Sequence, residues 1–143
     1  MDIAILAPAA VLVLWSLIML LWMAGTRFPA MAKSGQDLAN AKPGGRGIDL
    51  EGVIPDKVNW KSHNYTHLME QPTLFYATVV ILALTNAGHG LNLYLAWAYV
   101  AIRIVHSIWQ ATVNLVKVRF LLFVVATICL LIMAINAVWV TLF

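Results

Sequence analysis

Four apolar stretches, each long enough to cross a lipid bilayer, take up most of this chain of 143 residues. A hydrocarbon layer about 30 Å thick is spanned by roughly 20 helical residues. The candidate spans run over about 3–24, 65–87, 91–112 and 118–142. Their apolar runs are continuous, and backbone polar groups in lipid must be bonded internally, so helices are favoured over barrel strands. The sequence predicts one all-α membrane domain over 1–143, a four-helix bundle with a polar loop at about 25–62.

The composition excludes a water-soluble domain, because 62% of the residues are hydrophobic and only 10% are charged. The formal net charge of +3 does not indicate a nucleic-acid partner, since the basic residues are divided between two short loops. Cys129 is the single cysteine, so no disulfide can form within the chain. We therefore expect membrane lipid, and no nucleic acid, as a partner.

The distribution of Lys and Arg predicts the orientation in the membrane. Basic residues occur between the first and second spans and between the third and fourth, and none occurs between the second and third. By the positive-inside rule, both basic loops are cytoplasmic and both termini face the other side. The chain begins Met1-Asp2 without a basic segment, and its first apolar run exceeds that of a signal peptide. We expect that run to remain as the first span.

A polar stripe marks the second span. His63, His67 and Glu70 stand at i, i+4 and i+7, which places them on one face of a helix. Counted from Ser62 at ~1.5 Å per residue, Glu70 lies roughly 12 Å into the membrane. Pro72 follows closely, and a kink is expected there.

The third span carries a second stripe, Arg103, His106 and Gln110 at i, i+3 and i+7. The same arithmetic places Arg103 roughly 9 Å deeper than Glu70, a gap that two long side chains can close. An ionisable group at mid-bilayer costs roughly 2.5–3.5 kcal/mol and normally turns toward a partner or a wet cavity. We expect Glu70 and Arg103 to face one another or to share one polar pocket. The alternative is a purely structural pair that fixes the register of the helices.

These stripes carry a family resemblance. The segment from His67 to Phe75, with Glu70 two residues before Pro72, is followed by an Arg-x-x-His pattern at 103–106 and by Arg119. The combination resembles the MAPEG family, the membrane-associated proteins of eicosanoid and glutathione metabolism, most of all its bacterial branch. The resemblance covers nearly the whole chain and implies a homotrimer in a bacterial inner membrane, with sites between subunits that open toward the cytoplasm.

The resemblance also implies an activity, that of a glutathione-dependent transferase or peroxidase acting on lipophilic electrophiles or hydroperoxides. Glu70 would then bind the amino group of glutathione, Arg103 and His106 its carboxylate or backbone groups, and Arg119 its thiolate. Three positions depart from the family pattern. Thr66-His67 replaces an Arg-Asn pair and Gln110 replaces a Tyr, although His67 and Gln110 can still hydrogen-bond a ligand.

Arg119 cannot continue the stripe of the third span. Sixteen residues at about 100° each turn it ~160° away from Arg103 on one helix. It must therefore belong to the start of the fourth helix or serve a neighbouring subunit.

Two other classes of protein remain open on the residues alone. A small proton-coupled exporter also has four helices and a membrane carboxylate, but this first span has no acid after Asp2 and the first loop is long. A non-catalytic protein that binds lipid or another ligand would keep the polar pocket without the chemistry. Proton-driven flux that depends on Glu70 would distinguish the exporter.

Overall fold

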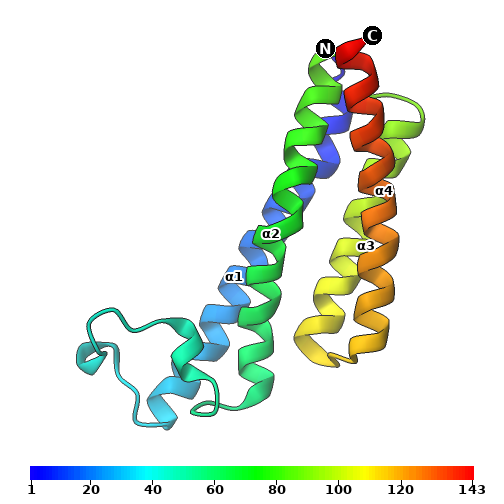
Figure 1. The fold of residues 1–143 in the computed structure, drawn as a ribbon. Helices are drawn as coiled ribbons and strands as arrows, with labels where there is room; N and C mark the ends of the chain where they lie inside the picture. The colour runs from blue at the N-terminus through cyan, green and yellow to red at the C-terminus, as the bar shows by residue number, and fades with distance from the viewer.

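The computed structural model describes residues 1–143 and contains four long helices. They are α1 (Leu6–Lys33), α2 (Asp56–Leu84), α3 (Leu91–Thr112) and α4 (Val116–Leu142). Successive helices run in opposite directions, and Figure 1 shows both termini at one end and the long loop at the other. All four are long and apolar enough to cross a membrane. The predicted all-α fold of four membrane-spanning helices is confirmed.

The first two helices are longer than hydropathy predicts. α1 continues to Lys33 rather than about 24, and α2 begins at Asp56 rather than about 65 and ends at Leu84 rather than 87. Hydropathy marks where the chain enters lipid, whereas a helix ends where its backbone hydrogen bonds end, so polar turns extend both helices. The first connection therefore shrinks to residues 34–55, with short 3-10 turns at Leu38–Asn40 (η2) and Gly47–Leu50 (η3). α2 remains helical through Pro72.

The core is a cluster of buried apolar side chains from all four helices, with an aromatic pair where α2 meets α3. The ring of Phe75 stacks on that of Tyr99, with centroids 4.4 Å apart, and both residues are fully buried. On the α3 side facing α4, Asn136 Nδ2 donates to Asn92 Oδ1 at 2.8 Å. Such a bond within a membrane bundle contributes roughly 0.6 kcal/mol. Packing, this bond and the one that Gln71 Nε2 of α2 donates to Thr127 Oγ1 of α4 at 2.8 Å thus hold α4 to the rest of the bundle.

The turn between α2 and α3 binds the start of the chain. Asp2 Oδ2 accepts from Gly88 N at 2.9 Å and contacts His89 Nδ1 at 2.8 Å. The hydrogen bond from His89 lowers the pKa of the Asp2 carboxyl. A Cβ built on Gly88 would lie 2.7 Å from Ile5 Cγ2, so the close approach requires glycine.

The long loop is attached to the helices on either side of it. Arg27 of α1 donates from Nη2 to Gly47 O at 2.7 Å and from Nη1 to Ser62 Oγ of α2 at 3.2 Å. A Cβ on Gly47 would lie 2.9 Å from Arg27 Nη1, so a larger residue here would require the guanidinium to shift. Ile54 is buried just before α2 begins. These contacts hold η3 beside the first turns of α2.

Candidate functional site

His67 is the centre of the polar cluster inside the bundle. Its ring stands between Arg103, whose Nη1 lies 3.3 Å from Nε2, and Glu70, whose Oε2 lies 3.0 Å from Nδ1. A guanidinium only donates, so Nε2 must accept and the ring proton sits on Nδ1, which donates to Glu70. Arg103 also donates from Nη2 to the backbone carbonyl of His67 at 3.2 Å. The geometry therefore fixes both the tautomer and the orientation of the imidazole.

Glu70 and Arg103 form no direct ion pair; instead each bonds to His67. The imidazole of His67 lies between Glu70 and Arg103, which differ in depth in the membrane and whose long side chains were expected to meet directly. The two ends of this chain of contacts differ in environment, since Arg103 is 0% exposed whereas the Glu70 side chain is 63% exposed. Glu70 is therefore the end that faces the chamber.

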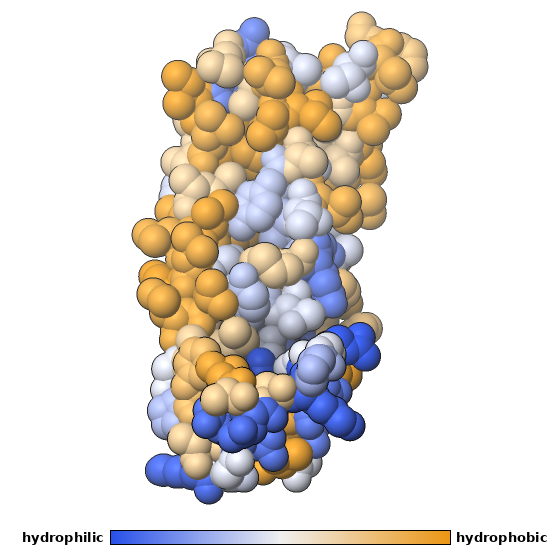
Figure 2. Space-filling model, turned by 90° about the vertical axis from the view of Figure 1, so that its left-hand side faces the viewer, coloured by the Kyte–Doolittle hydropathy of each residue, from blue (hydrophilic) through white to orange (hydrophobic).

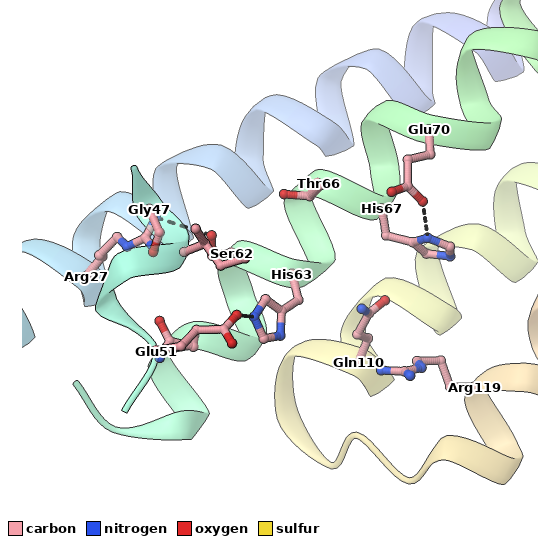
Figure 3. A pocket seen from close by; sticks show the side chains of 12 residues that line it. Arg27, Gly47, Glu51, Ser62, His63, Thr66, His67, Glu70, Gln110 and Arg119 are labelled. Carbon is pink, nitrogen blue, oxygen red and sulfur yellow. Dashed lines mark hydrogen bonds and ion pairs between the residues drawn. The ribbon is translucent and has the colours of Figure 1, made fainter. Parts of the chain in front are cut away.

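The chamber is a cavity of about 650 Å³ near the loop end of the bundle, and only one of its twelve lining residues is hydrophobic. All four helices and the long loop contribute to it. Figure 3 shows the side chains of α2 along one wall, the loop with Glu51 at one side and Gln110 and Arg119 opposite. The lining residues are Arg27, Gly47, Ile48, Glu51, Asn59, Ser62, His63, Thr66, His67, Glu70, Gln110 and Arg119.

Four of the six residues singled out in the sequence line this chamber: His67, Glu70, Gln110 and Arg119. Gln110 is 5% exposed, and its Oε1 has no hydrogen-bond partner in the protein. Arg119 lies in the first turn of α4, where its Nη1 donates to Asn114 Oδ1 at 2.7 Å. A buried acceptor without a partner and a positioned cation thus both border the same polar space.

Arg103 and His106 do not line the chamber but stand behind it. Both are buried, and the ring of His106 lies 5.0 Å from that of His67. His106 Nε2 is buried without a hydrogen-bond partner. A smaller cavity of about 150 Å³ borders His106, and His67 and Arg119 line it as well, together with the apolar residues Val116, Phe120 and Phe123. Arg103 and His106 therefore support His67 instead of reaching the chamber.

Several lining residues come from places that helical periodicity does not reveal. Glu51 arrives from the loop, and its Oε1 lies 2.7 Å from His63 Nε2. Arg27 borders the far wall, where it binds Gly47 and Ser62. His63 belongs to the polar stripe of the second span, which the sequence already showed. Nothing in the sequence places Glu51 beside it, because loop conformation sets that contact.

The fold and this chamber define a multi-pass membrane protein with a polar pocket enclosed by its own spans. The chain matches the MAPEG family model over residues 5–139 and belongs to the MAPEG family. Comparison with curated proteins and with solved structures gave no match.

Proposed function

We propose that this protein is a glutathione-dependent transferase or peroxidase that acts on lipophilic electrophiles or hydroperoxides. The observation that carries the proposal is the chamber of about 650 Å³, with a single hydrophobic residue in its lining, within the bundle of a MAPEG chain. Its volume falls within the roughly 300–1,000 Å³ typical of small-molecule sites. Its lining is too polar for a lipid tail, which favours a polar ligand at this position.

The residues present suit a peptide ligand. Glu70 offers a carboxylate to an ammonium group, and Arg119 offers a guanidinium to an anion. The unpartnered Oε1 of Gln110 needs a donor, and a peptide N–H can supply it. Glutathione carries an ammonium, carboxylates and peptide N–H groups, so its chemistry fits this set of side chains.

When bound, glutathione supplies a thiol as the nucleophile. Arg119 keeps a permanent positive charge at the chamber wall, and a nearby cation lowers the pKa of a thiol and raises its thiolate fraction. Asn114 accepts from Arg119 Nη1 and so limits where the guanidinium can point. The small cavity with Phe120 and Phe123 on the other side of Arg119 suits the lipophilic substrate.

Arg103 and His106 act through His67 in this proposal. Arg103 holds the imidazole by two contacts, and the imidazole holds the Glu70 carboxylate. A carboxylate fixed in this way loses less freedom when it binds an ammonium group. Arg103 is therefore a positioning residue for Glu70.

The exposure of Glu70 supports a homotrimer. Its side chain is 63% exposed on the side of a membrane helix. Figure 2 shows that one face of the molecule carries paler, less hydrophobic residues between apolar ones. A carboxylate left facing lipid costs roughly 2.5–3.5 kcal/mol near mid-bilayer. A neighbouring subunit that covers this face would remove that cost and complete the chamber.

The orientation follows the basic residues. The loop that borders the chamber lies at the end of the molecule that is rich in Lys and Arg. By the positive-inside rule, the chamber therefore opens toward the cytoplasm and both termini face the opposite side. We propose a bacterial inner membrane as the location, in line with the resemblance of the motif. Cysteine accessibility at the loop and at the termini, measured in intact cells, tests this orientation.

The direct test of the activity is titration of the purified protein with glutathione, followed by thiolate absorbance and by calorimetry. Wild type should bind at millimolar glutathione and show a thiolate band that Arg119→Ala removes. Lys117→Ala is the matched control, since it removes a cation two residues away that does not line the chamber. No binding to wild type, or equal thiolate signals in the two variants, would contradict the proposal.

A further inference from the structure

A second pair of His and carboxylate side chains borders the chamber, and the proposed chemistry does not use it. Glu51 Oε1 lies 2.7 Å from His63 Nε2, one helical turn before the pair formed by His67 and Glu70. Figure 3 shows the two pairs along the same wall, one brought by the loop and the other by α2 alone. Glu51 Oε2 has no protein partner. It is therefore free to meet a ligand.

The contacts around Glu51 hold it over the chamber. Its backbone N donates to Ile48 O at 3.0 Å, which closes the η3 turn, and Asn59 Nδ2 of α2 contacts Leu50 O at 3.4 Å. Arg27 fixes the beginning of the same turn through Gly47 O at 2.7 Å. The carboxylate thus stands on a segment that is bound to both α1 and α2.

Glu51 also sets the charge of the chamber. The ionised groups in the lining are two guanidiniums, Arg27 and Arg119, and two carboxylates, Glu51 and Glu70. With the imidazoles counted as neutral, these charges cancel. The charge of Arg27 is in addition engaged by the carbonyl of Gly47. The next cation, Arg103, is buried behind His67 and bonded to it, so the lining itself offers no excess positive charge to a ligand that carries a net negative one.

We propose that Glu51 is a specificity-determining residue through which the chamber prefers a peptide thiol of zero net charge to one that is a net anion. Glutathione, with two carboxylates and one ammonium, is a net anion, so on this inference it binds less tightly than a neutral analogue of itself. The preferred ligand has one carboxylate and one ammonium, which suits a lining that offers carboxylates on one side and the guanidinium of Arg119 on another. This inference rests on the proposed function, because it assumes that the chamber binds a peptide thiol.

The experiment compares two probes that differ by one charge, glutathione and its glycyl monoethyl ester, by calorimetry on the full-length protein in detergent. Wild type should bind the ester more tightly. Removal of one negative charge from the lining should change the ratio of the two dissociation constants by about tenfold in favour of glutathione, because unit charges interact appreciably across a chamber of this size. Glu51→Gln is the variant that tests this shift. The bulk of the ester affects wild type and variant alike, so it cancels in the comparison.

Two further variants complete the design. Glu51→Asp keeps the charge and should keep the wild-type preference, whereas Asp56→Asn removes a negative charge from the first turn of α2, outside the chamber, and should leave the ratio unchanged. If both probes bind and Glu51→Gln has the wild-type ratio, the inference is overturned while the proposed function stands. If neither probe binds wild type, the proposed function fails and this inference fails with it.

Discussion

Arg103 should be coupled to His67 more strongly than to Glu70, and a double-mutant cycle can measure the difference. Arg103 is fully buried and donates two hydrogen bonds to His67, one to its ring and one to its carbonyl. Arg103→Met leaves both acceptors without a donor, and an unsatisfied buried group costs about 1–3 kcal/mol. His67→Phe leaves a buried guanidinium with only the carbonyl, and the loss of one partner of a buried charge costs about 3–5 kcal/mol.

The double variant removes both partners of the contact. Its loss in free energy of unfolding should therefore be about 1–3 kcal/mol smaller than the sum of the losses in the two single variants. The cycle with Glu70→Gln and Arg103→Met should give a coupling below about 0.5 kcal/mol, because no contact joins those two side chains and glutamine can still accept from His67. Unfolding of the protein in mixed micelles with a denaturing detergent supplies the free energies. A Glu70–Arg103 coupling as large as that of His67–Arg103 would refute the central role given to the imidazole.

Three further outcomes are expected. Asn136→Ala should destabilise the bundle by roughly 0.6 kcal/mol, and no further in a background of Asn92→Ala, as measured by the same unfolding assay. The hydrogen bond from His89 lowers the pKa of the Asp2 carboxyl in the folded protein. Ionised Asp2 should therefore stabilise the fold at pH values above its ordinary pKa of 3.8, and this stability should be lost as the pH falls through the lowered pKa. Asp2→Asn should remove this acid-dependent part of the unfolding midpoint. Gly88→Ala should lower the melting temperature, since its Cβ would lie 2.7 Å from Cγ2 of Ile5, just before α1. An unchanged melting temperature would show that this contact is loose.

Much of the fold could be predicted because lipid imposes simple rules on a sequence. The third span was predicted at its observed bounds, 91–112, and the fourth within two residues, since hydrophobic length and short turns define both. The predicted ends of α1 and α2 near the loop were wrong: α1 ends at Lys33 instead of about 24, and α2 begins at Asp56 instead of about 65. There the helices continue through polar sequence, where hydropathy no longer reports on backbone hydrogen bonding.

The candidate site was only partly predictable. Helical periodicity placed His67 and Glu70 on one face, and the structure brings Gln110 and Arg119 from two other helices to the same chamber. The expected meeting of Glu70 with Arg103 occurs through a third residue, because depth arithmetic along straight helices cannot say which side chain fills the space between them.

The sequence by itself determined that this is a membrane protein with four helices, and that an ionisable residue in a span needs a partner or a wet cavity, because the cost of exposing charge to lipid depends on composition and spacing alone. Only the tertiary structure decided that His67 separates Arg103 from Glu70 and that the loop carries Glu51 to His63. Those contacts join residues far apart in the chain. Their geometry depends on how helices and loop pack, a property that no local pattern of residues contains.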